Sequence, residues 1–340
     1  MNLTGDKMLM MLKKTVFLLI AAAFCVVPWV FRATRDYAPG LAVISGIIFS
    51  VAWGNPFSKV TSKLTSPLLG ATIVGMGFGM DLMKVLRAGA DGFIYTMIGI
   101  VCGIGFGVLI GKMLKLPKNA MYLVSVGTSI CGGSAIAAAA PALKAKAHDV
   151  AMASATVFTL NAIALLIFPW LGHALDMSQE QFGYFAALAI HDTSSVVGAT
   201  LQYGAEALEV GTTVKLARAL WIVPVTVFLS CFVAEREAGE KRTVRFKIPW
   251  FIPGFIAAAA IVTYLPQLWS GCGEFIVKGG GFLKNLSKYM MIVTLFLIGA
   301  NLSREKLREL GWRPVIQGTL LWLLLSAIWC TAIVFRIVRV

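Results

Sequence analysis

Apolar runs long enough to cross a lipid bilayer recur along most of this 340-residue sequence. A membrane-spanning helix needs about 17 to 25 residues to cross roughly 30 Å of hydrocarbon. We predict eleven such spans, of which the second is short and the fifth and seventh are interrupted. Their ranges are 15–31, 40–53, 66–82, 90–111, 119–143, 149–170, 181–202, 207–234, 249–265, 287–302 and 314–335.

The composition agrees with a membrane protein, because 58% of the residues are apolar and only 14% are charged. The mean hydropathy of +0.82 does not describe a water-soluble domain of this length. The polar stretches 234–247 and 271–288 are of loop size, and no linker separates soluble domains. We therefore predict an all-α polytopic fold in which residues 1–340 form a single integral membrane domain.

Basic residues outnumber acidic ones by 30 to 16, but they are spread among the predicted loops. That spread argues against nucleic acid as a partner and fits the excess of Lys and Arg in cytoplasmic loops. The distribution predicts that the N-terminus lies in the cytoplasm. Because Arg32 and Arg35 directly follow the first span, and no small-x-small cleavage site is evident, we expect that span to be retained.

Known catalytic and cofactor motifs are missing from the sequence. The six cysteines lie mostly within predicted spans and show neither a CxxC pair nor metal-ligand spacing. The glycine pattern "GMGFGM" (75–80) lies inside a span, which argues against a dinucleotide site. We therefore expect no enzyme activity, no cofactor and no bound metal.

Internal similarity predicts a repeat, with repeat-like elements at 40–170 and 181–335. The segments 79–89 and 299–311 each end one apolar run and precede another, and Asp81 in the first matches Asn301 in the second. The predicted topology gives these two segments opposite orientations, as an inverted repeat requires. A weaker pair, 131–155 and 192–217, would share one orientation, so either a span is miscounted or that similarity is only chemical.

The first interruption, "GTSICGGSAIAAAAP" (127–141), combines glycines, hydroxyls and a proline in an apolar setting. Irregular backbone at membrane depth is tolerated where it lines a cavity or contacts a ligand. The free N–H groups at the start of a half-helix attract anions. We interpret Gly132, Gly133 and Ser134 as part of a substrate site, although packing between helices is the alternative explanation of such small residues.

The second interruption, "AIHDTSSVVGATLQYG" (189–204), places ionisable and hydroxyl groups in the middle of an apolar run. Ionisable side chains at that depth usually line a pathway or pair with one another. We predict that His191 and Asp192 exchange a coupling proton and that Thr193, Ser194 and Ser195 contact the substrate. The alternative is a wet loop in which Asp192 caps a helix.

Lys215 and Arg218 stand three residues apart on one face of an apolar helix, too deep for ordinary loop charges. Snorkelling or pairing with a carboxylate would explain them structurally. Beside anion-binding half-helix ends, they indicate a negatively charged substrate. Asp149 is either a helix cap or a third coupling-ion residue, and we assign Asn161 and His173 structural roles.

In these motifs the chain resembles the sulfate exporter family of bacterial inner-membrane proteins. The resemblance rests on "GMGFGMDL" (75–82), "GTSICGGSAIAAAAPALKA" (127–145), "AIHDTSSVVGA" (189–199) and "FLIGANLS" (296–303), and it covers nearly the whole chain. That family is distantly similar to the superfamily of bile-acid/sodium symporters and sodium/proton antiporters. The resemblance implies two broken helices that cross at mid-membrane in a core domain, which moves against a panel domain.

The resemblance also has implications for individual residues. Residues 131–136 stand in part of the place of the first break of the bile-acid relatives, but the asparagine that binds sodium there has no counterpart here. Asp149 falls where relatives carry an acid at the start of the next helix. Lys215 falls on the helix where some antiporters carry a basic residue.

The sequence therefore predicts a secondary transporter that exports or exchanges sulfate, sulfite or an organosulfonate, with protons as the coupling ion in preference to sodium. The expected partners are a small anion, protons and the lipid bilayer, and a homodimer is compatible with the sequence. A sodium/proton-type cation antiporter is the alternative within the same fold. A membrane scaffold or sensor without transport activity is the alternative from another class.

Overall fold

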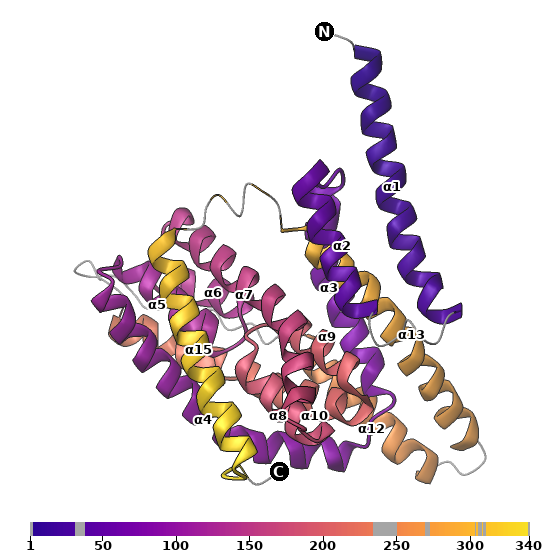
Figure 1. The fold of residues 1–340 in the computed structure, drawn as a ribbon. Coiled ribbons are helices and arrows are strands. Elements are labelled where there is room, and N and C mark those ends of the chain that lie inside the picture. Colours follow the sequence, from indigo (N-terminus) through magenta and orange to yellow (C-terminus); the bar gives the residue numbers. More distant parts are fainter. Residues whose placement is uncertain are drawn as a thin grey trace. The chain divides into compact units, whose positions relative to one another are not determined.

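The computed structural model describes residues 3–30, 38–233, 250–268, 273–302, 304, 308 and 311–338, and every regular element in these ranges is a helix (Figure 1). The chain divides into two compact units, each built from two separate segments. The first unit combines Met1–Met83 with Trp250–Arg304, and the second combines Lys84–Pro249 with Glu305–Val340. The predicted loop 234–247 and most of the repeat motif after Leu302 lie outside the described residues.

The first unit is a group of helices packed around α13. Within it α13 packs against α2 and α3, α3 packs against α12, and α1 lies against α13 and α2. Its helices are α1 (Leu3–Val30), α2 (Ala38–Trp53), α3 (Ser58–Gly77), α12 (Phe251–Leu268) and α13 (Gly273–Ala300).

Glycine allows α2 and α13 to approach until their backbones touch. A Cβ atom on Gly46 of α2 would overlap the carbonyl oxygen of Phe296 in α13. In the reciprocal direction, a Cβ atom on Gly299 would overlap the carbonyl oxygen of Val43. Such small-residue contacts are the usual way in which helices associate closely in membranes.

The second unit contains both interrupted helices. Its core includes α8, in which every residue from Phe182 to Ala189 is buried, and the ring of Phe168 stacks on those of Phe185 and Trp322. The elements are α4 (Leu82–Met113), α5 (Lys118–Ser129), α6 (Gly133–Ala142), α7 (Ala147–Ala174), α8 (Gln179–Ala189), α9 (Thr193–Tyr203), α10 (Ala205–Ala219), α11 (Ile222–Phe228), the π-helix η2 (Leu229–Val233) and α15 (Trp312–Val334).

Seven helices in the described part of the chain are long and apolar enough to cross a membrane. Each of the eleven predicted spans overlaps one of these seven helices, α2, α3 or one of the two half-helix pairs α5–α6 and α8–α9. The all-helical fold is confirmed. The total of eleven spans, the internal repeat and the core-and-panel arrangement remain predictions.

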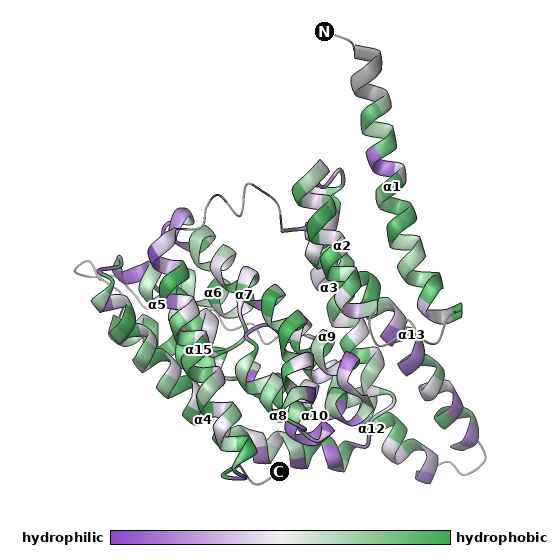
Figure 2. Ribbon diagram, in the orientation of Figure 1, coloured by the Kyte–Doolittle hydropathy of each residue, from purple (hydrophilic) through white to green (hydrophobic). Residues whose placement is uncertain are grey.

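One predicted loop is wrong over most of its length, because α13 begins at Gly273 instead of near residue 287. Charged residues in the first half of α13 interrupt the apolar pattern, as the hydrophilic colouring in Figure 2 shows. Helical structure there is supported by an ion pair between Glu274 and Lys278, one turn apart, with 2.6 Å between the charged atoms. The glycine at 280 packs against the Phe78 carbonyl oxygen, where a Cβ atom would approach to 2.7 Å.

Candidate functional site

Two helical interruptions meet inside the second unit. The first separates α5 from α6 at residues 130–132, and the second separates α8 from α9 at residues 190–192. A Cβ atom placed on Gly132 would lie 3.3 Å from the Cβ of Asp192 and 3.5 Å from its Cα. The interruptions at both predicted positions therefore bring four helix ends together in one place.

Arg218 binds the C-terminal ends of both α5 and α8. Its Nε donates to the Ser129 carbonyl at 2.8 Å, and its Nη1 donates to the carbonyls of Ala187 and Leu188 at 2.9 and 2.8 Å. Its Nη2 also donates to Ser129. The last carbonyls of a helix have no partner within it and carry partial negative charge, so a buried guanidinium is well placed there. Arg218 is 1% exposed.

Lys215 joins the two interruptions in the same way, one turn earlier on α10. Its ammonium group donates to the Ile130 carbonyl at 2.9 Å and to the Ile190 carbonyl at 2.7 Å. The side chain is completely buried, so snorkelling to an interface does not account for it. No carboxylate of the described residues lies within ion-pair distance of Lys215 or Arg218, and both cations are held by backbone carbonyls.

The N-terminal ends of α6 and α9 differ in their capping. Gly132 is the N-cap residue of α6, has φ +65°, and contributes no side-chain cap. At α9 the carboxylate of Asp192 accepts hydrogen bonds from the backbone N–H and the hydroxyl of Ser194. The positive end of α9 is therefore neutralised by its own acid, whereas the N–H groups at the start of α6 face no acidic side chain of that helix.

The two ends also differ in exposure. At α6, Gly133 is half-buried and Ser134 is exposed. At α9, the predicted substrate residues Thr193, Ser194 and Ser195 are all buried. Among the predicted substrate residues, only Gly133 and Ser134 at the start of α6 are not buried.

Asn161, which we assigned a structural role from the sequence, connects the two interruptions. It lies on α7, and its Oδ1 accepts hydrogen bonds from the N–H groups of His191 and Asp192 at 3.1 and 3.3 Å. Its Nδ2 would lie 3.5 Å from a Cβ on Gly132 and is buried, with no hydrogen-bond partner among the described residues. A lone amide in the apolar run 149–170 was the available sequence signal.

The three predicted coupling-ion residues are not gathered in one place. Asp192 lies at the meeting point, and His191 beside it is 1% exposed, with both ring nitrogens buried and unpartnered among the described residues. Asp149 lies in the first turn of α7, twelve residues before Asn161, which is about 18 Å along the helix axis. Asp149 is therefore remote from the two interruptions.

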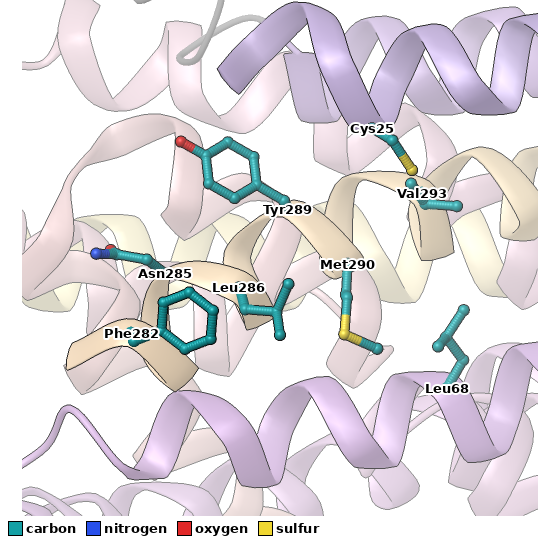
Figure 3. Close-up of a pocket in the computed structure, with 8 residues that line it drawn as sticks. All are labelled: Cys25, Leu68, Phe282, Asn285, Leu286, Tyr289, Met290 and Val293. Atoms are coloured by element: carbon teal, nitrogen blue, oxygen red, sulfur yellow. The ribbon is translucent and has the colours of Figure 1, made fainter. Parts of the chain in front are cut away.

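A separate pocket of about 590 Å³ lies in the first unit and is lined from α1, α3 and α13 (Figure 3). Its lining is largely apolar, with Asn285 and the hydroxyl of Tyr289 as polar groups at one end. None of the residues predicted to bind substrate or a coupling ion lines it. The remaining lining residues are Cys25, Leu68, Phe282, Leu286, Met290 and Val293.

Comparison with known proteins finds a family match over most of the chain. The sequence model of a family described as conserved hypothetical protein 698 matches residues 11–318. A UPF0324 membrane protein of Bdellovibrio bacteriovorus is 49% identical over 312 residues, which cover 92% of this chain and 91% of the relative. A UPF0324 membrane protein of Geobacter sulfurreducens is 46% identical over 314 residues, covering 92% and 94%.

A third relative, a UPF0324 membrane protein of Bacteroides thetaiotaomicron, is 45% identical over 307 residues, covering 86% of this chain and 88% of its own. No solved structure matches the chain. Together with the seven apolar helices, these relatives identify the chain as a multi-pass membrane protein.

Proposed function

We propose that this chain, which belongs to the family described as conserved hypothetical protein 698, is a secondary transporter that exports or exchanges a small anion. The observation that carries the proposal is the start of α6. It combines a helix N-terminus without a side-chain cap, an exposed Ser134, and a position beside the second interruption. Helix N-termini of this kind bind anions through free N–H groups and the helix dipole.

The balance of formal charge supports an anion. The two interruptions are held by two cationic side chains, Lys215 and Arg218, and carry one carboxylate, Asp192. The partial charges of two helix N-termini and two C-termini cancel. A single negative charge on the substrate, or two negative charges with a proton on Asp192, would therefore neutralise the region. In this proposal the cations act at a distance, since their hydrogen bonds go to carbonyls.

The same geometry supports proton coupling. An anion at the start of α6 would lie near the Asp192 carboxylate, because a Cβ atom on Gly132 would lie only 3.3 Å from the Cβ of Asp192. Like charges at short range repel each other, so we propose that the anion and the coupling proton bind together. We propose sulfate, sulfite or an organosulfonate as the substrate, and a bacterial inner membrane with the N-terminus in the cytoplasm as the setting.

Reconstitution tests the proposed function. Purified protein in liposomes should accumulate radiolabelled sulfate or sulfite when a proton gradient is imposed, and a protonophore should abolish the accumulation. Currents on a solid-supported membrane that respond to sodium, but not to any of these anions, would instead select a cation antiporter. Background transport of every tested ion would favour a scaffold or sensor without transport activity.

A further inference from the structure

The amide nitrogen of Asn161 is a buried hydrogen-bond donor that meets no acceptor among the described residues. Asn161 is 2% exposed, and its orientation is fixed because two backbone N–H groups donate to its Oδ1. The opposite end of the amide must then be the nitrogen, with two N–H donors. A buried donor without a partner costs about 1–3 kcal/mol, so such a group in a native structure requires an explanation.

The position of this nitrogen supplies one. It would lie 3.5 Å from a Cβ on Gly132, which places it beside the residue that precedes α6. The first intrahelical bond of α6 runs from the Ile136 N–H to the Gly132 carbonyl, so the N–H groups of Gly133 and Ser134 precede the helical ladder. Donors from α6 and α7 thus lie next to each other at one helix end.

Phe158 lies on a further side of the N-terminal end of α6. It precedes Asn161 by three residues on α7, so the two side chains lie on the same helix face. A Cβ on Gly133 would lie 2.6 Å from the Phe158 ring, which therefore covers that glycine on one side. Ser134, which follows Gly133, is exposed.

We propose that Asn161 is a substrate-binding residue: its Nδ2 donates to an oxyanion held by the Gly133 and Ser134 N–H groups, while its Oδ1 holds the backbone of His191 and Asp192. This inference rests on the proposed transport of an anion and deepens it. The ligand class is a small oxyanion with several acceptor oxygens, such as sulfate or sulfite, because donors from two helices have to be satisfied at once. One amide would then connect the substrate with the residue that carries the coupling proton.

Asn161→Asp tests the donor separately from the acceptor. The variant keeps an oxygen for the two N–H groups of the second interruption, so both of those hydrogen bonds remain, although the buried carboxylate should lower the melting temperature in detergent. It replaces the donor with a charged acceptor. We expect the KM for sulfate uptake to rise about ten- to hundredfold and the sulfate-induced rise in melting temperature to disappear. Asn161→Ala should show both the affinity loss and a lower melting temperature.

Gln202→Glu is the matched control. It makes the same amide-to-acid change on α9, where the Gln202 amide donates only to the carbonyl one turn earlier, that of Gly198. Its KM should stay within about twofold of wild type, since it removes no group assigned to the substrate. If the wild-type protein takes up sulfate and the KM of Asn161→Asp is unchanged, this inference is overturned and the proposed function stays intact.

A second measurement covers the case in which Asn161→Asp does not fold. Alkylation of a Ser134→Cys variant by a maleimide, followed at that position by peptide mass spectrometry, should slow at least threefold in sulfate relative to gluconate at equal ionic strength. Equal labelling rates in a variant that still transports sulfate would overturn the location of the site. If wild-type protein transports no anion at all, the proposed function itself fails.

Discussion

The two interrupted helices end alike but begin differently. At the C-terminal ends of α5 and α8, the same pair of cations on α10 binds the free carbonyls of both half-helices. At the N-terminal ends, α9 is capped by Asp192 and buried, whereas α6 starts at a glycine and is exposed at Ser134. Because the same two cations bind both C-terminal ends, we interpret these contacts as structural. The difference at the N-terminal ends indicates that the start of α6, and not that of α9, is available to a ligand.

We expect the largest effect on stability from the loss of Arg218, which binds the C-terminal ends of both α5 and α8. Arg218→Ala would leave three buried carbonyls without their donor, each costing about 1–3 kcal/mol, so the free energy of unfolding should fall by roughly 3 kcal/mol or more. Thermal unfolding in detergent and uptake assays should both show the loss. Arg87→Ala, which removes an exposed arginine from α4, should change neither. A melting temperature of Arg218→Ala equal to that of the wild type would contradict the structural role of this cation.

The backbone at the start of α6 predicts the next largest effect. Gly132 has φ +65° and ψ −127°, which an L-residue adopts only at a cost of about 1–3 kcal/mol. Gly132→Ala should lower the melting temperature and reduce uptake at least tenfold, because its methyl group would lie against Asp192 and Asn161. Gly105→Ala on α4, where nothing lies within 4 Å of the new Cβ, is the control and should transport normally.

The acidic cap of α9 predicts an effect on coupling with little effect on folding. Asparagine caps helices about as well as aspartate, so Asp192→Asn should fold normally. It cannot carry the coupling proton, and accumulation driven by a proton gradient should fall at least tenfold while sulfate/sulfate exchange continues. Asp149→Asn, remote on α7, should keep gradient-driven accumulation. The reverse result for the two variants would move the coupling site from Asp192 to Asp149.

Removal of the hydroxyl groups at the N-terminal ends of α6 and α9 should have the smallest effects. These two variants directly test the difference between the two helix ends. Ser134→Ala removes an exposed hydroxyl beside the proposed anion and should raise KM about two- to tenfold without changing the melting temperature. Ser194→Ala removes a bond to the Asp192 carboxylate and should cost about 1 kcal/mol of stability with KM unchanged. A raised KM in Ser194→Ala alone would place the substrate at α9 instead.

Local composition was sufficient to predict where the helices are interrupted. Glycines next to hydroxyls in 127–141, and a histidine followed by an aspartate in 189–204, are costly inside an apolar helix, so the break positions could be located from the chain alone. The start of α13 could not be, because Lys278, Lys284 and three consecutive glycines break the apolar pattern while the helix continues.

The hydrogen-bond partners of the buried polar side chains could not be predicted from the sequence, for a different reason. Lys215 and Arg218 were expected near a negative charge, and the groups that they bind are backbone carbonyls, which every residue carries and which leave no sequence signal. Asn161 was passed over because one amide in an apolar run does not reveal that its two ends serve different helices.

The contact between α2 and α13 has a mechanical consequence. Where Gly46 lies against the Phe296 carbonyl and Gly299 against that of Val43, no side chain separates the two backbones. Sliding one helix along the other would bring larger residues into that contact. The two helices should therefore move together as one rigid body. Whatever conformational cycle the protein performs, its bending has to occur elsewhere.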